Sequence, residues 1–117
     1  MLDAIPTIDA TRIAELTARE EKQFRDQRPK SVDLWRKARR SMPRGVPSSF
    51  QDARPQPVFI DRGKGSKVWD ADGNEYVDFH NGFGVMVVGH AHPDIVRAIS
   101  DRAALGTHFA QPTADVA

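Results

Sequence analysis

Four histidines are the residues of this chain best suited to bind a metal or move a proton, and all of them lie in its second half: His80, His90, His92 and His108. His90 and His92 would point to the same side of an extended segment, a spacing that suits zinc or copper. No third ligand stands at a clear spacing, and His92 directly precedes Pro93, where a helix would begin. We therefore expect no metal site, and a structural or substrate-lining role for the histidines.

A glycine-spaced apolar loop lies between the first two of these histidines. Residues 81–90 are NGFGVMVVGH, with Gly82 and Gly84 on either side of Phe83. Glycines let the backbone approach a ligand closely, and an aromatic ring can pack on an apolar substrate group. The same pattern would also serve a buried crossover whose glycines only improve packing. The sequence leaves both interpretations open.

Other catalytic patterns lack the residues that they need. Gly63 and Gly65 are not followed by the further glycine and the helix that a phosphate-binding loop requires. No serine stands in a nucleophile elbow. Cysteine is absent, which excludes disulfides and thiolate sites and favours a reducing, cytoplasmic location. Asp70, Asp72 and Asp78 cluster around a predicted hairpin, where stabilising the turns explains them better than acid–base catalysis.

Two helices are predicted in the first half of the chain. Asp9 is a good N-cap residue for a first helix that Pro29 would break, and the apolar stripe of this helix is thin. Ser31 would cap a second, short helix over 32–40. Closely spaced prolines, glycine and serines then predict an irregular loop over 42–57.

The second half begins with a predicted antiparallel meander. Its strands are expected at 58–62, 66–70 and 75–79, and Gly63–Gly65 would form the first turn. The second turn contains Asp-Gly, a strong hairpin signal because the turn needs a positive φ.

A helix is predicted to follow the glycine-spaced loop. Pro93 suits its first turn, and Gly106 suits its end. Its buried face would consist of Ile95, Val96, Ile99 and Ala103. A last helix would begin at Thr113. Because most large apolar residues lie in this half, we expect the hydrophobic core here.

Composition limits the chain to one small domain. It has 117 residues and a net charge of +1, too short for two domains. No apolar run is long enough to cross a bilayer, and the first residues lack a secretory-signal pattern. A basic run could contact nucleic acid, but only Trp35 is interleaved with it, so a solvated helix face is the more ordinary interpretation. That run consists of Arg36, Lys37, Arg39, Arg40 and Arg44.

Several blocks of the sequence resemble class III pyridoxal-phosphate (PLP) aminotransferases, closest to the glutamate-1-semialdehyde aminomutase type, across roughly residues 31–117. The two most specific blocks are DADGNEYVD from Asp70 to Asp78 and GHAHP from Gly89 to Pro93, in this order and spacing. Shorter matches are Leu34-Trp35, Met42-Pro43 with Gly45-Val46, Gly106-Thr107 and Pro112-Thr113. Residues 1–30 show no usable resemblance.

The resemblance implies an α/β protein with the fold of type I PLP-dependent transferases, of which this chain would be the N-terminal portion. N-terminal helices and a loop would occupy 1–57, and the antiparallel β-meander 58–79. The glycine-rich loop and helix over 80–117 would lead into a large PLP-binding domain. The complete protein would be a homodimer that transfers an amino group between an amino acid or amine and a keto acid or aldehyde.

The resemblance also implies which residues would form the site. In the family a lysine holds PLP as a Schiff base, and PLP acts as an electron sink. No lysine of this chain matches that position, so the chain alone is predicted to be inactive. The residues predicted to line the substrate pocket are Ser49, Gln51, Phe83 and Gly84. Those predicted near a dimer-shared entrance are Thr107 and His108.

Two of these positions depart from the aminomutase type. Gln51 stands close to the place of an arginine that binds a substrate carboxylate, and Phe83 stands at the place of a tryptophan. A neutral amide cannot replace a bidentate guanidinium group. We therefore expect a substrate other than glutamate-1-semialdehyde, with an apolar side chain.

Two other functions remain open from the sequence alone. The chain could be a non-catalytic interaction module that pairs with a separately encoded chain through its apolar loop and basic helix, or a nucleic-acid-binding segment. A free-standing module should be monodisperse, whereas a truncated enzyme should expose 85–88 and aggregate. Nucleic-acid binding should depend steeply on salt.

Overall fold

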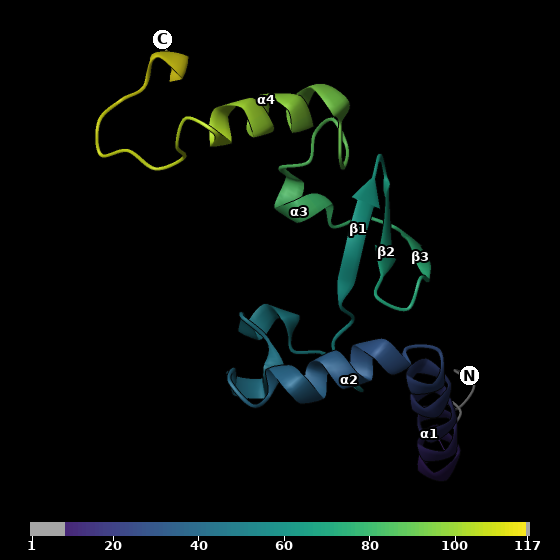
Figure 1. The fold of residues 1–117 in the computed structure, drawn as a ribbon. Helices are drawn as coiled ribbons and strands as arrows, with labels where there is room; N and C mark the ends of the chain where they lie inside the picture. The colour runs from purple at the N-terminus through teal and green to yellow at the C-terminus, as the bar shows by residue number, and fades with distance from the viewer. Residues whose placement is uncertain (1–8, 117) are drawn as a thin grey trace, which may run out of the picture. The chain divides into compact units, whose positions relative to one another are not determined.

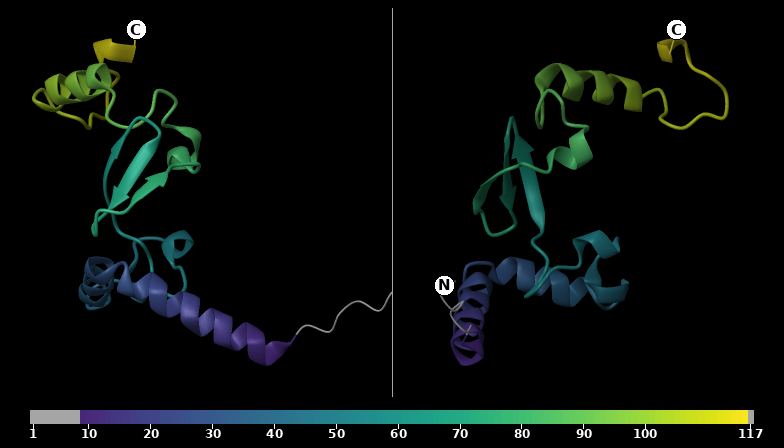
Figure 2. Two further views of the ribbon diagram at one scale, coloured as in Figure 1. Left: turned by 90° about the vertical axis from the view of Figure 1, so that its right-hand side faces the viewer. Right: turned by 180° about the vertical axis from the view of Figure 1, so that it is seen from behind.

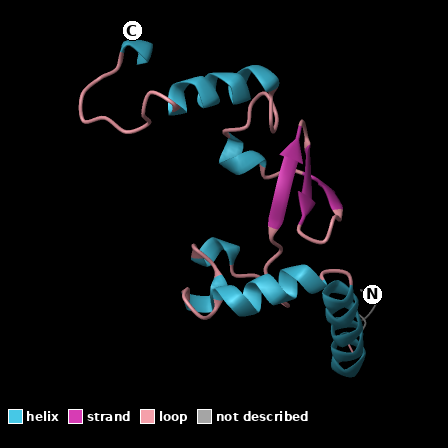
Figure 3. Cartoon of the chain, in the orientation of Figure 1, coloured by secondary structure: helices cyan, strands magenta, loops and turns pink. Residues whose placement is uncertain are grey.

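The structure, a computed structural model, describes residues 9–116. Residues 1–8, with the interpretation that they carry no secretory signal, and residue 117 lie outside the described residues. The elements, shown in Figure 1 and coloured by type in Figure 3, are α1 (Ala10–Asp26), α2 (Pro29–Ala38), η1 (Pro43–Gly45), η2 (Ser49–Gln51), β1 (Ile60–Lys64), β2 (Lys67–Asp70), β3 (Glu75–Val77), α3 (Asn81–Gly84), α4 (Pro93–Ala103) and η3 (Ala114–Val116).

The chain forms two compact units. The first comprises the residues up to Asp61 together with Trp69–Asn74, and the second comprises Arg62–Val68 and the residues from Glu75 onward. Each unit is described by itself below. The division into segments 1–57, 58–79 and 80–117 stays a prediction.

The start of α1 follows the sequence prediction, but the start of α2 does not. Asp9 Oδ1 accepts hydrogen bonds from the backbone N–H groups of Thr11 (2.9 Å) and Arg12 (3.2 Å). Pro29 begins α2 instead of only ending α1, because proline suits the first turn of a helix. Ser31 is therefore buried inside α2 and does not cap it. Figure 2 shows that α2 runs in a different direction from α1.

The predicted loop over 42–57 contains two single 3₁₀ turns, η1 and η2. In η1, Arg44 and Gly45 both have positive φ angles, +57° and +75°. A Cβ atom on Gly45 would lie 2.7 Å from Cδ1 of Trp35. Only glycine therefore lets this turn pack directly against α2.

The three strands form one sheet in the order β1-β2-β3. Tight turns join them, as an antiparallel meander requires. The predicted first turn is displaced, because Gly63 and Lys64 belong to β1 and the chain reverses at Gly65, where φ is +57°. Glycine at 63 also has a packing role, since a Cβ atom there would lie 2.6 Å from Cγ of His90.

The predicted core in the second half is wrong. Among the described residues the one buried large hydrophobic side chain is Val46, at 7% exposure. The expected buried face of α4 is open, with Ile95 and Val96 each 49% exposed and Ile99 63% exposed. Amphipathic spacing is present, but the described chain places nothing over this face. The last helix, expected to begin at Thr113 and to be cut off after about one turn, is a single 3₁₀ turn, η3, that starts at Ala114.

None of the helices within residues 9–116 is both long and apolar enough to cross a membrane.

Candidate functional site

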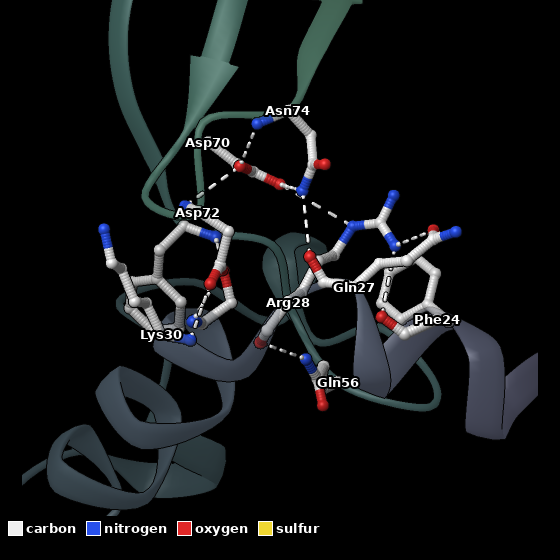
Figure 4. Close-up of polar contacts among 10 residues, drawn as sticks. Phe24, Gln27, Arg28, Lys30, Gln56, Asp70, Asp72 and Asn74 are labelled. Atoms are coloured by element: carbon white, nitrogen blue, oxygen red, sulfur yellow. Dashed lines mark hydrogen bonds and ion pairs between the residues drawn. The ribbon is translucent and has the colours of Figure 1, made fainter.

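A buried aspartate organises the turn between β2 and β3 (Figure 4). Asp70 Oδ1 accepts the backbone N–H of Asp72 at 3.0 Å and that of Asn74 at 2.8 Å. Asp70 Oδ2 accepts the side-chain amide of Asn74 at 2.9 Å and lies 3.7 Å from Nε of Arg28. The Asp70 side chain is fully buried, so these partners offset the cost of removing its charge from water. Its predicted role in the turn is confirmed.

Asp72 has a role that the sequence prediction missed. Its two carboxylate oxygens accept the backbone N–H groups of Lys30 at 2.7 Å and Ser31 at 3.0 Å, in the first turn of α2. The N-cap residue of this helix, Arg28, makes no side-chain cap. Asp72 therefore caps a helix 42 residues earlier in the chain, and Figure 4 shows it beside Lys30. The DADGN block holds the junction of α1 and α2, and its two carboxylates are engaged in these structural contacts.

A second carboxylate, Asp78, lies in the other unit and pairs with His90. Asp78 Oδ1 accepts the backbone N–H groups of His80 and Asn81, both at 2.9 Å, and its Oδ2 lies 2.6 Å from His90 Nε2. The hydrogen bond with His90, followed by that from the Asn81 backbone, lowers the pKa of Asp78 from its ordinary value.

The histidine pair considered for a metal is divided between two local roles. His90 pairs with Asp78, and the backbone of His90 bonds that of Gly65 in both directions at 2.8 and 2.9 Å. His92 Nδ1 accepts the backbone N–H of Asp94 at 3.3 Å, at the start of α4. Within residues 9–116 no three metal-binding side chains gather at one point.

The glycine-spaced loop forms a left-handed turn, α3. Asn81, Gly82, Phe83 and Gly84 have φ angles of +52°, +57°, +62° and +83°. Left-handed backbone is routine for glycine and accessible to asparagine, but for a bulky residue such as phenylalanine it stores strain of about 1–3 kcal/mol. The Phe83 ring is 76% exposed and meets the His80 ring edge-on, with centroids 4.2 Å apart. The chain thus holds an exposed aromatic ring at some cost in stability, as functional sites often do.

The structure places the predicted substrate-lining residues in two turns. Ser49 and Gln51 belong to η2 in the first unit, and Phe83 and Gly84 belong to α3 in the second. Gln51 borders a hollow of about 310 Å³ whose other walls are Val46, Pro47, Pro57, Val58, Phe59 and Ile60. Ser49 is exposed and is not among its walls. That all four residues share one pocket stays a prediction.

The predicted entrance residues are neighbours in the chain after α4. Thr107 Oγ1 lies 2.7 Å from His108 Nδ1, and both residues are exposed. This segment returns to α4 through an ion pair of 3.0 Å between Arg102 and Asp115. Their predicted place at a dimer entrance stays a prediction.

The five lysines do not suit the covalent attachment of a carbonyl cofactor. All are exposed, and Lys22 and Lys67 are occupied by ion pairs with Asp26 and Glu75. A lysine that forms a Schiff base is normally activated by burial in a hydrophobic pocket or by a nearby cation. The residues described here therefore do not fit the anchor of such a cofactor.

Sequence reasoning also missed an arginine-rich hollow in the first unit. It is lined by Trp35, Arg39, Arg44, Asp52 and Arg54. Three of these belong to the helix and turn in which a basic run was noted, but the contributions of Asp52 and Arg54 depend on the path of the loop. No local sequence pattern predicts the path of this loop.

Comparisons with known proteins agree on one family. The sequence model of the family described as Aminotransferase class-III matches residues 49–115. Glutamate-1-semialdehyde 2,1-aminomutase 2 of Brevibacillus brevis is 43% identical over 89 residues, which cover 74% of this chain and 21% of that protein. The chain thus spans about a fifth of the length of the curated relatives that it matches.

Two solved structures cover most of the chain. A beta-phenylalanine aminotransferase from Variovorax paradoxus matches with a TM-score of 0.77 and 31% identity, over 86% of this chain and 24% of that one. A glutamate-1-semialdehyde-aminomutase from Pseudomonas aeruginosa PAO1 in complex with PMP matches with a TM-score of 0.77 and 32% identity, over 93% of this chain and 24% of that one.

These likenesses confirm the predicted fold class, since helices and a small antiparallel sheet are what the N-terminal portion of these enzymes contains. They also confirm the predicted cofactor at the level of the family, because its structures include forms with PLP or PMP bound. The chain belongs to the class III aminotransferases.

Proposed function

We propose that this chain is the N-terminal, substrate-contacting portion of a PLP-dependent aminotransferase or aminomutase. The enzyme would move an amino group between an amino acid or amine and a keto acid or aldehyde. When bound, PLP supplies the electron sink for that chemistry. The exposed lysines make this chain an unsuitable anchor for PLP, so we propose that its own task is to bind and orient the substrate.

The observation that carries the proposal is the left-handed turn at α3. Phe83 has a φ of +62° and is 76% exposed, between two glycines that also have positive φ. A bulky residue in this backbone region costs about 1–3 kcal/mol, and the ring of Phe83 meets the His80 ring edge-on. Presenting a flat aromatic face to a bound molecule is a use that explains both the strain and the exposure.

The second proposed substrate contact is Gln51, and it bears on the substrate class. The hollow beside Gln51 is walled by apolar residues, and Gln51 contributes its one amide. An amide lacks the charge that would hold a carboxylate strongly. We propose an amino donor with an apolar or aromatic side chain. The match to a beta-phenylalanine aminotransferase supports this class, although curated relatives are aminomutases.

The remaining parts of the proposal concern assembly and location. We propose that the complete enzyme is a homodimer in the cytoplasm, with Ser49 and Gly84 also lining the substrate pocket and Thr107 and His108 near its shared entrance. Sedimentation of the natural protein and blotting of cell fractions test these two statements separately.

The proposed function is tested by a chimera. Residues 31–116 of this chain replace the aligned segment of the Pseudomonas aeruginosa aminomutase, to which the chain is similar over 93% of its length. Amino transfer is measured with an aromatic amino donor and with glutamate-1-semialdehyde. The chimera should prefer the aromatic donor, and Phe83→Ala should lower kcat/KM for that donor about tenfold or more, because an apolar contact with the transition state is lost.

Phe79→Ala is the matched control. Phe79 is another phenylalanine of the same unit, is 94% exposed and is not among the proposed pocket residues. It should change kcat/KM by less than about twofold if the effect at Phe83 is specific. A chimera that transfers amino groups but is indifferent to both substitutions would refute the proposed role of α3.

A further inference from the structure

An arginine-rich hollow of about 320 Å³ lies in the first unit. It is formed where α2, η1 and the chain after η2 meet. Its walls are Trp35, Arg39, Arg44, Asp52 and Arg54. Three guanidinium groups against one carboxylate leave the hollow with an excess of two positive charges. None of these residues belongs to the proposed substrate-lining set, and none borders the hollow beside Gln51.

The back wall of the hollow is fixed by contacts between α2 and η1. Trp35 Nε1 donates a hydrogen bond of 2.8 Å to the carbonyl oxygen of Arg44. The backbone of Gly45 lies so close to the indole that a Cβ atom would be 2.7 Å from Trp35 Cδ1 and 2.8 Å from Arg39 Cγ. Trp35 and Arg39 are therefore held against a rigid turn.

Only one of the three positive charges in the hollow is balanced by a carboxylate. Arg44 forms an ion pair with Asp52, in which Nη1 of Arg44 lies 2.7 Å from Oδ2 of Asp52. The Arg39 guanidinium lies over the Trp35 ring, 5.0 Å from its centroid, an arrangement that keeps its N–H groups available at the edges. Within residues 9–116 neither Arg39 nor Arg54 pairs with a carboxylate. Arg39 and Arg54 thus share the hollow with a single carboxylate, Asp52, which is already paired with Arg44.

We propose that this hollow binds the oxyanion group of a small molecule, a carboxylate or a phosphate, through Arg39 and Arg54. The guanidinium fork matches both groups in bidentate geometry, and charge-assisted hydrogen bonds are about twice as strong as neutral ones. Trp35 also lines the hollow and supports Arg39 from below. The site is separate from the proposed amino-transfer pocket and does not depend on that function.

Binding is followed through the indole N–H signal of Trp35 in ¹H–¹⁵N spectra of the 117-residue chain. The chain has two tryptophans, and a Trp69→Phe variant identifies which signal belongs to Trp35. Sodium phosphate and sodium glutarate are titrated separately at an ionic strength held constant with sodium chloride. The proposal expects a saturable shift with at least one of them, and the tighter ligand identifies the group as phosphate or carboxylate.

Variants at the two unpaired arginines test the assignment. Arg39→Gln and Arg54→Gln should each weaken binding about tenfold or more, because each removes a charge-assisted pair. Arg54→Lys should weaken it less, since the charge remains while the fork is lost. Circular dichroism checks that each variant keeps its helices.

Arg40→Gln is the matched control. Arg40 is exposed, lies next to Arg39 in sequence and does not line the hollow, so its loss should change affinity by less than about twofold if binding is local. Absence of a saturable shift with both anions would overturn the proposal. So would an equal loss in Arg40→Gln and Arg54→Gln, which indicates general attraction to a basic surface. Neither result depends on amino-transfer activity, so this test is independent of the proposed function.

Discussion

Asp78 is a carboxylate whose protonation bears on the local structure of the second unit. Its pKa is lowered chiefly by the hydrogen bond with His90 and next by that from the Asn81 backbone. A lowered folded-state pKa means that the carboxylate stabilises the folded form. That contribution is complete above the ordinary aspartate pKa of about 4, and it is lost as the pH falls from there through the lowered value.

Asp78→Asn should therefore reduce thermal stability at pH 6 to 7 and should matter progressively less below pH about 4. The unfolding midpoint of the two proteins, measured by circular dichroism across this range, gives the difference at each pH. Asp101→Asn, at an exposed position on α4 of the same unit, is the control and should give no comparable trend. A constant difference between Asp78→Asn and the parent chain would contradict the account.

The sequence predicted the roles of individual side chains well where their hydrogen-bond partners are close in the chain. The Asp-Gly turn indicated that Asp70 would bond its own hairpin, and it does. The role of Asp72 escaped prediction because its partners, Lys30 and Ser31, lie about forty residues away. The strain at Phe83 also escaped, since flanking glycines are equally compatible with a relaxed loop.

Among the elements, α2 depends on a cap that comes from another part of the chain. Its first two free N–H groups are bonded by Asp72, and Pro29 removes the need for one more. This explains why the helix begins three residues before the predicted position. Sequence rules place a proline at a helix boundary. They do not show whether the helix ends before the proline or begins at it, unless the capping residue is close in sequence.

Asp72→Ala should loosen the first turn of α2. Loss of an N-cap acceptor costs about 0.5–2 kcal/mol, which corresponds to about 2- to 30-fold faster amide exchange at Lys30 and Ser31. Hydrogen exchange followed by NMR measures this directly. The control is Asp33→Ala on the same helix, whose side chain is 76% exposed and pairs only with an exposed arginine. Equal acceleration in both variants would show that Asp72 does not act as the cap.

At the scale of the whole molecule, the described chain exposes apolar surface that a stable small protein would bury. Val85, Val87 and Val88 are 72%, 85% and 59% exposed, and the apolar face of α4 is open as well. The spacing of hydrophobic residues predicted which residues form the apolar face of α4. Burial of that face also requires a second surface to cover it, and the spacing carries no information about such a surface. This is why the predicted core failed while the helix itself was found.

The 117-residue chain should therefore self-associate in solution. Sedimentation velocity at increasing protein concentration should show a rising mean mass, and a Val85→Ser/Val87→Ser double variant should shift this rise to higher concentration because less apolar area is exposed. Ile13→Ser on α1, a position 50% exposed, serves as a control for general polarity. A monodisperse parent chain would favour the free-standing interaction module over the enzyme portion.

We propose above that this chain completes the substrate site of a class III aminotransferase and that the anchor of PLP lies elsewhere in the complete enzyme. The most direct test incubates PLP with the isolated chain and, in parallel, with the chimera, reduces both with borohydride and measures intact mass. We expect no stoichiometric adduct on the isolated chain and one adduct per chimera. A single adduct at one lysine of the isolated chain, or a chimera that takes up none, would contradict this proposal.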